Sequence, residues 1–196
     1  MNFTKSIQDH LNSSASVKQE MAESCSEQIN GIAARIIACF QSGGKLLICG
    51  NGGSAADAQH IAAEFVVRLS HDLMRPALPV ISLATDSSIM TAGGNDIGFE
   101  NVFSRQVEAL GKPDDVLIVI STSGNSENIL RAAKAARDKK VDVIGFLGSG
   151  GGSVQESCSL TLNIPSKVTA HIQEGHITAG HIICSLVEQS LFSENS

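Results

Sequence analysis

A short apolar segment that ends in a glycine-rich turn and leads into a helix constrains the fold of this chain most. The segment LLIC at 46–49 has the length and the bounds of a buried strand. It is followed by the turn GNGG at 50–53 and by an alanine-rich stretch that favours helix. Ser54 is a suitable N-cap, and Asp57 follows three residues later as in a capping box. This order of strand, tight turn and helix indicates an α/β fold.

The same pattern of strand, polar loop and helix returns further along the chain. The apolar run 115–120 leads into the serine-rich loop 121–126 and a helical stretch at 127–139. Further strands are predicted at 80–83, 141–147 and 160–164, and further helices at 86–92, 99–110 and 170–192. Strands that alternate with helices predict a parallel sheet with right-handed crossovers. We therefore expect a doubly wound, three-layer α/β sandwich with a five-stranded parallel sheet, which binds ligands at the carboxyl ends of its strands.

The first 43 residues carry apolar side chains at helical spacing and precede the α/β core at 44–196. They predict one short and one long helix, interrupted at 12–14 and ended by Gly43 and Gly44. Because the α/β core already looks complete, the apolar stripe of this N-terminal segment is expected to pack against another subunit. The chain of 196 residues as a whole is expected to form a single domain.

Composition and charge exclude several classes of partner. The net charge of −6 argues against a broad nucleic-acid surface, which would need a basic face. The five cysteines are odd in number, far apart and without CxxC spacing, so they do not suggest a disulfide framework or a thiolate zinc site. The first residues lack the apolar segment of a signal peptide, and no apolar run approaches the length of a membrane span. We expect a cytoplasmic protein with neither a nucleic-acid nor a membrane partner.

The two polar loops allow more than one type of ligand. The segment GNGGSA at 50–55 formally matches the dinucleotide fingerprint, but Asp72 and Asp86 are badly placed for the acidic residue that holds the ribose. No P-loop lysine follows either turn, which argues against hydrolysis of nucleoside triphosphates. Four hydroxyl groups in the second loop fit a phosphate monoester, although a simple capped turn is the alternative; they belong to Ser121, Thr122, Ser123 and Ser126.

A group of possible metal ligands is divided between two predicted helices. His60, Glu64 and Arg68 recur at every fourth position, so they share one face of the first helix. Gln173 and His181 lie eight residues apart on the last helix, about 80° around its axis. Two histidines, a carboxylate and a weaker amide oxygen would suit a tetrahedral or five-coordinate Zn²⁺ site, with a surface ion pair of His60 and Glu64 as the alternative. The other histidines, at 10, 71, 171 and 176, are expected on loops or helix surfaces.

Taken together, the segments GNGGSAADAQHIAAEF, GGNDIGFENVFSRQVEALG, STSGNS and IQEGH closely resemble the phosphoheptose isomerases of the sugar isomerase (SIS) domain superfamily. The resemblance implies a homotetramer with active sites between subunits. It also implies conversion of sedoheptulose 7-phosphate into D-glycero-D-manno-heptose 7-phosphate, the first step toward the activated heptoses of bacterial surface polysaccharides such as lipopolysaccharide. Members that bind a metal hold one zinc per subunit, at positions that match His60, Glu64, Gln173 and His181 here.

The resemblance also assigns roles to individual residues. Glu64 and His181 are the expected acid–base pair for an enediol mechanism. The expected substrate contacts are Asn51, Gly52, Gly53, Glu64, Arg68, Asn95, Asp96, Ser121, Thr122, Ser123, Ser126 and Gln173. The chain departs from the family pattern in the longer loop LSHDLMRP at 69–76 and at Ala170-His171, where many members have an acidic and a basic residue.

A non-catalytic protein on the same fold is the alternative. One relative in the superfamily binds the replication initiator protein and resembles this chain in the glycine turn, but it lacks the equivalents of Glu64 and His181. Their presence here favours the enzyme over a sugar-phosphate-binding or initiator-binding protein.

Overall fold

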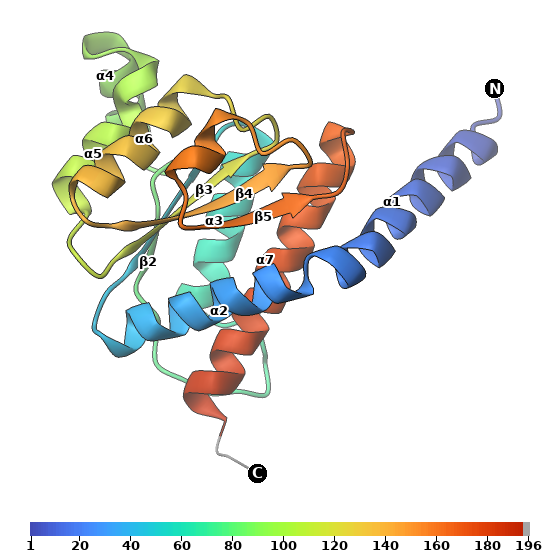
Figure 1. Cartoon of the computed structure of the whole chain (residues 1–196), viewed down its shortest axis with the longest axis horizontal. Coiled ribbons are helices and arrows are strands. Elements are labelled where there is room, and N and C mark those ends of the chain that lie inside the picture. The colour runs from blue at the N-terminus through green and yellow to red at the C-terminus, as the bar shows by residue number, and fades with distance from the viewer. Residues whose placement is uncertain (194–196) are drawn as a thin grey trace.

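The structure is a computed structural model, and it describes residues 1–193 of the chain. Its five strands form one parallel sheet in the order β2-β1-β3-β4-β5, flanked by helices (Figure 1). The helices are α1 (Thr4–Ser24), α2 (Ser26–Gln41), α3 (Gly53–Val66), α4 (Ser87–Asp96), α5 (Val102–Leu110), α6 (Glu127–Asp138) and α7 (Thr169–Phe192), with short 3-10 turns η1 (Phe99–Asn101) and η2 (Ser153–Ser157). The strands are β1 (Leu46–Gly50), β2 (Val80–Ser82), β3 (Val116–Ser121), β4 (Asp142–Gly148) and β5 (Leu160–Ile164). The predicted doubly wound α/β sandwich is thus confirmed, and only 194–196 of the predicted core lie outside the described residues.

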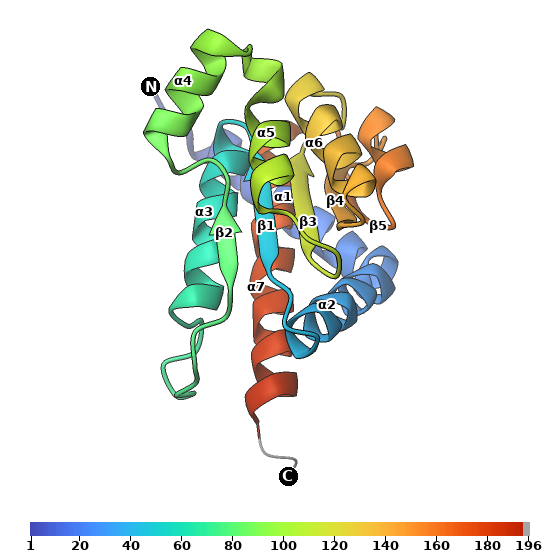
Figure 2. The ribbon, with the colours of Figure 1, turned by 90° about the vertical axis from the view of Figure 1, so that its left-hand side faces the viewer.

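Two apolar cores explain why the central strands are continuous apolar runs. Successive side chains of a strand point to opposite faces of the sheet. In β1, Leu46 and Ile48 pack with α2, α3 and α7, whereas Leu47 and Cys49 pack with α5 and α6. Figure 2 shows helices on both sides of the sheet. A parallel sheet covered on both faces requires apolar residues at every position of its inner strands.

The order of the strands places a ligand crevice between β1 and β3. The chain passes from β1 to β2 on one side and then returns to β3 on the other side. In sheets with this order, the crevice opens at the carboxyl ends of the two strands where the direction of winding changes. The glycine turn after β1 and the serine loop after β3 both lie at this point.

The N-terminal helices differ from the prediction in two respects. The interruption expected at 12–14 is wrong: α1 continues through Asn12 to Ser24, and Cys25 separates it from α2. Asn12 and Ser13 are exposed, the buried Ser14 donates to Glu174 of α7, and the Ser16 hydroxyl donates to the Asn12 carbonyl within the helix. The stripe of α2 is buried in the chain's own core, through residues such as Ile32 and Ile36.

Of the two N-terminal helices, it is α1 that keeps large apolar side chains exposed. Phe3, Ile7 and Leu11 are largely exposed on this helix, which projects from the body of the molecule (Figure 1). The expectation of a subunit contact therefore remains a prediction, and it applies to α1.

Two predicted helix ends are also corrected. Helix α3 begins at Gly53, so Ser54 lies inside the helix and is not its N-cap. Asp86 does cap α4, where its carboxylate accepts from the Ile89 amide, but Gly93 does not end this helix, which continues to Asp96. Among residues 1–193, no helix is both long and apolar enough to cross a membrane.

Candidate active site

The glycine turn brings α7 close to the start of α3. Gly52 has a φ of +56°, in the region that favours glycine, and it lets the chain turn from β1 into α3. A Cβ atom on Gly53 would lie 2.4 Å from Nε2 of Gln173, so the carboxamide of Gln173 packs directly against this turn. The predicted substrate-binding residues Gly52, Gly53 and Gln173 therefore lie together.

Three of the four predicted metal ligands also meet in the structure. His60 and Glu64 lie on α3 and His181 lies on α7, and their ligand atoms are all within 4.8 Å of one another. Nε2 of His60 is 2.8 Å from Nε2 of His181 and 3.2 Å from Oε1 of Glu64. The two helices approach closely because Gly180 has no side chain: a Cβ there would lie 2.8 Å from Ile61. The side chain of His60 is 48% exposed, so the group opens onto the surface of this subunit.

The donor atoms of this group fit a zinc ion. Imidazole nitrogen and carboxylate oxygen are typical zinc ligands, and tetrahedral bonds of about 2.1 Å place two ligand atoms about 3.4 Å apart. The separations in the group are close to this value. Gln173 is eight residues before His181, which corresponds to about 12 Å along the helix, and its carboxamide is at the glycine turn. Its role as the fourth ligand remains a prediction.

Asp57 has a different position from the one predicted. Because α3 begins at Gly53, this carboxylate cannot complete a capping box with Ser54. Its Oδ2 atom is buried without a hydrogen-bond partner among the described residues. Burial raises the pKa of Asp57, and the nearby His60 opposes this shift. An under-satisfied carboxylate thus lies one helical turn before the histidine of the metal group.

The serine loop is shaped by its own backbone contacts. The buried hydroxyl of Ser121 accepts a hydrogen bond from the Gly124 amide at 3.1 Å. Gly124 has a φ of +63°, and a Cβ there would lie 1.9 Å from the carbonyl oxygen of Gly151. Ser123 accepts from the Asn125 amide and is exposed. The loop therefore has a fixed form that presents its remaining hydroxyl groups outward.

A small hollow beside this loop is lined by a lysine that the sequence analysis did not predict. Thr122 and Ser123 line it together with Lys167, which lies between β5 and α7, and Thr169, the first residue of α7. Lysine provides a positive charge suited to a phosphate group. The only signal for this residue in the sequence is its position three residues after the carboxyl end of a strand.

Asn51 makes a contact that the sequence did not predict. Its amide group pairs reciprocally with that of Asn128 on α6, with hydrogen bonds of 2.9 and 2.8 Å. Asn128 is buried, so the pair ties the glycine turn to the helix that follows the serine loop. The side chain of Asn51 holds the two loops together, and its substrate contact remains a prediction.

Three other predicted substrate contacts bond to neighbours outside these groups. Arg68 is beyond the end of α3, where its guanidinium contacts the sulfur of Met74 at 3.0 Å, so it does not share the helix face of His60. Asn95 and Asp96 are exposed at the end of α4 and hydrogen bond to each other at 2.6 Å.

A buried ion pair ties the long loop to the helix of Glu64. Nε of Arg75 donates to Glu188 at 2.8 Å, and both side chains are almost completely buried. Another guanidinium nitrogen of Arg75 donates to the backbone carbonyl of Glu64 at 2.8 Å. Glu188 also accepts from the backbone amides of Leu69 and Ser70. The loop that departs from the family pattern is thereby attached to both α3 and α7.

Two histidines expected on the surface are buried. His176 is fully buried, its Nε2 donates to the Leu147 carbonyl, and burial lowers its pKa to about 4. His171 is buried where α1 packs on α7, next to His10. The expectation was wrong because α7 has neighbours on several sides, which the spacing of its residues does not reveal.

Comparison with known proteins agrees with this architecture. The SIS domain family matches residues 9–148. A phosphoheptose isomerase of Roseiflexus sp. (strain RS-1) is 50% identical over 192 residues, which cover 98% of this chain and 96% of the relative. Solved phosphoheptose isomerases from Neisseria gonorrhoeae and Francisella tularensis are 41% and 38% identical, with TM-scores of 0.90 and 0.92, and each match covers 96% of this chain and 100% of the other.

These matches extend over nearly the whole chain, and they include the strands, the polar loops and both helices of the metal group. The chain therefore belongs to the SIS domain family and, within it, to the phosphoheptose isomerases, which are enzymes.

Proposed function

We propose that this chain converts sedoheptulose 7-phosphate into D-glycero-D-manno-heptose 7-phosphate, a precursor of activated heptoses for bacterial surface polysaccharide such as lipopolysaccharide. The observation that carries the proposal is the group of His60, Glu64 and His181, which brings a carboxylate and two imidazoles within 4.8 Å of one another on the two helices that meet at the glycine turn. Relatives at about 50% identity that bear the name phosphoheptose isomerase support it.

The phosphate end of the substrate is assigned to the serine loop. Thr122 and Ser123 present hydroxyl groups to the hollow that Lys167 also lines, and Ser126 precedes the first turn of α6. Hydroxyl groups, a lysine and the amides at a helix start are suitable donors for a phosphate dianion. Binding at this end would hold the sugar carbons in a fixed position relative to the acid–base group.

The reaction moves one proton from C1 of the ketose to C2, and a second proton between the oxygens on these carbons. A base removes the proton from C1, which forms an enediol, and an acid returns a proton to C2. Glu64 and His181 are the proposed pair, and the structure makes neither of them the preferred base. His60 lies between them and would keep both oriented.

Zinc is the proposed cofactor, at one ion per subunit, held by His60, Glu64, His181 and Gln173. When bound, the ion supplies Lewis-acid polarisation of the carbonyl and hydroxyl oxygens of the substrate.

A homotetramer in the cytoplasm, with active sites at the subunit contacts, is the proposed assembly. Three features support such contacts: the exposed apolar side chains of α1, the open side of His60, and the position of Arg68. Helix α3 has 14 residues and is about 21 Å long, and Arg68 lies beyond the end opposite to the glycine turn. A substrate contact by Arg68 therefore fits the site of a neighbouring subunit best.

The test is a turnover assay of the purified chain with sedoheptulose 7-phosphate, with added zinc and after chelation. We expect aldose formation by the wild type, slower turnover after chelation, and no turnover by Glu64→Gln. Glu108→Gln, an exposed change on α5, is the matched control and should retain wild-type activity. Substrate binding without turnover by the zinc-loaded wild type would instead indicate a non-catalytic sugar-phosphate-binding protein.

A further inference from the structure

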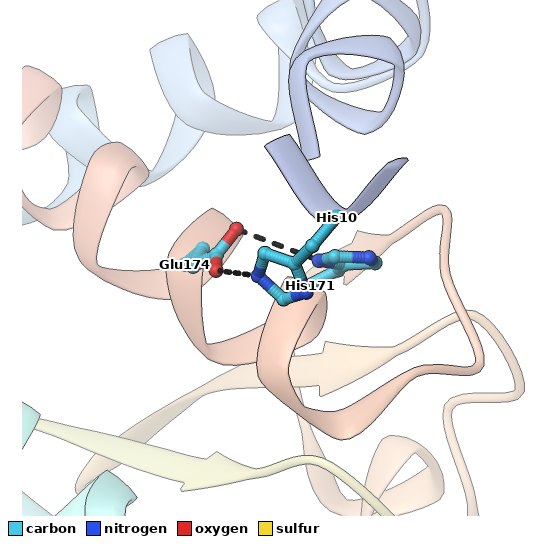
Figure 3. A group of neighbouring side chains, drawn as sticks. All are labelled: His10, His171 and Glu174. Atoms are coloured by element: carbon cyan, nitrogen blue, oxygen red, sulfur yellow. Dashed lines mark hydrogen bonds and ion pairs between the residues drawn. The ribbon is translucent and has the colours of Figure 1, made fainter. Parts of the chain in front are cut away.

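A second group of metal-ligand side chains lies between α1 and α7, away from the acid–base group. His10 on α1 faces His171 and Glu174 on α7, and the ligand atoms of the three side chains are all within 4.8 Å of one another (Figure 3). His171 and Glu174 are three residues apart and so share one face of α7. Nε2 of His10 is 3.1 Å from Oε1 of Glu174, and Nδ1 of His171 is 3.5 Å from Oε2.

One ring nitrogen in this group has no hydrogen-bond partner among the described residues. His171 is only 6% exposed, and its Nδ1 atom is buried with no hydrogen-bond partner among residues 1–193. An unpaired polar atom in a buried environment is destabilising. Its nearest polar neighbour is Oε2 of Glu174 at 3.5 Å, an ion-pair contact that is too long for a good hydrogen bond, so a metal ion bound to both groups would satisfy the nitrogen.

We propose that His10, His171 and Glu174 form a second binding site for a divalent transition-metal ion of the zinc type. Four-coordinate zinc with bonds of about 2.1 Å separates its ligand atoms by about 3.4 Å. The two histidine nitrogens lie 3.1 and 3.5 Å from different oxygens of the Glu174 carboxylate, and one ligand atom from each residue can be chosen so that all three are within 4.8 Å of one another. Two imidazoles with one carboxylate favour zinc or a similar ion over Mg²⁺ or Ca²⁺, which prefer oxygen ligands.

The neighbours of Glu174 include a hydroxyl donor and a lysine that opposes a cation. The Ser14 hydroxyl donates a hydrogen bond to Oε2 of Glu174. The Lys18 ammonium lies 3.6 Å from Oε2 of Glu174 and donates to the Ser14 hydroxyl. Lysine therefore competes with a metal for this carboxylate, and its removal should strengthen metal binding.

A metal here would cross-link the N-terminal helix to the helix that carries Gln173. Besides this group, α1 contacts the rest of the described chain mainly through its second half, and Phe3 and Ile7 remain exposed. The ion would thus fix the direction in which α1 projects. This inference does not depend on the proposed reaction.

The experiment uses a parent variant that lacks the first group, His60→Ala/His181→Ala, so that zinc at the second group is measured alone. Zinc content after equilibrium dialysis should be about one per chain in the parent. Adding His10→Ala, an exposed position that leaves the core intact, should weaken zinc binding at least tenfold. Adding His71→Ala, a change at an exposed loop histidine outside both groups, should leave the zinc affinity unchanged. Adding Lys18→Met should raise the zinc affinity.

Absence of zinc from the parent would overturn the proposal. Equal zinc affinity of the His10→Ala and His71→Ala forms would also overturn it. Circular dichroism spectra that match the parent would show that each variant retains the fold. Because the readout is bound metal and the first group is absent, failure of this test would leave the isomerase proposal untouched.

Discussion

The buried pair of Arg75 and Glu188 gives a quantitative prediction about stability. In Glu188→Gln the side chain keeps its size and an oxygen for the backbone amides of the loop, but the Arg75 guanidinium loses its counter-charge while its side chain stays fully buried. Leaving one partner of a buried ion pair uncompensated costs about 3–5 kcal/mol. For a chain of this length each kcal/mol corresponds to about 2–4 °C, so the unfolding midpoint should fall by about 6–20 °C.

The assay is urea denaturation followed by circular dichroism, with an exposed ion pair as the control. Arg105 and Glu108 on α5 have side chains that are 65% and 53% exposed, so Glu108→Ala should change the free energy of unfolding by less than about 0.5 kcal/mol. The double variant Arg75→Met/Glu188→Gln removes both charges and should be more stable than Glu188→Gln alone. A loss below about 1 kcal/mol in Glu188→Gln, or a double variant less stable than the single one, would refute the reasoning.

Two further predictions concern the serine loop and a strand end. Gly124→Ala would place a Cβ 1.9 Å from a backbone carbonyl oxygen, at a φ of +63°. The substitution should therefore destabilise the fold by about 2 kcal/mol or more and raise KM for the sugar phosphate. Thermal unfolding and steady-state kinetics measure the two effects. Burial raises the pKa of Asp115, but hydrogen bonds from Lys45 and Lys112 outweigh it and the net pKa is lowered. Its contribution to stability is therefore present above the unfolded value of about 3.9 and is lost as the pH falls through the lower folded value. Urea titrations across this pH range should show that the free energy of unfolding falls more steeply with decreasing pH in the wild type than in Asp115→Asn. Equal slopes of the free energy against pH would contradict this assignment.

The strands and their loops could be predicted from the sequence because each is a local pattern. The fifth strand was expected at 160–164 and is found there, and the inner strands are within one residue of the prediction at each end. The grouping of His60, Glu64 and His181 followed from helical spacing on two helices and from the family resemblance. These signals lie within short segments, where periodicity and turn residues decide the local structure.

The features that could not be predicted depend on contacts between distant segments. His171 is buried because α1 packs on α7, and Arg75 bonds to Glu188, which lies 113 residues further along the chain. Asn128 gave no signal, since its importance comes from its amide pair with Asn51 across two loops. The break at Cys25 between α1 and α2 was missed because Asn and Ser at 12–14 suggested an earlier break, whereas Ser14 is buried and bonds to Glu174 of α7.

The proposed proton transfer is tested most directly by isomerisation in deuterium oxide. If Glu64 and His181 move the proton through an enediol, the aldose formed by the wild type should carry deuterium at C2, visible by NMR. Glu64→Gln should form no aldose, whereas Glu108→Gln should match the wild type. Complete retention of protium at C2, together with wild-type turnover by Glu64→Gln, would contradict the proposed site and its mechanism.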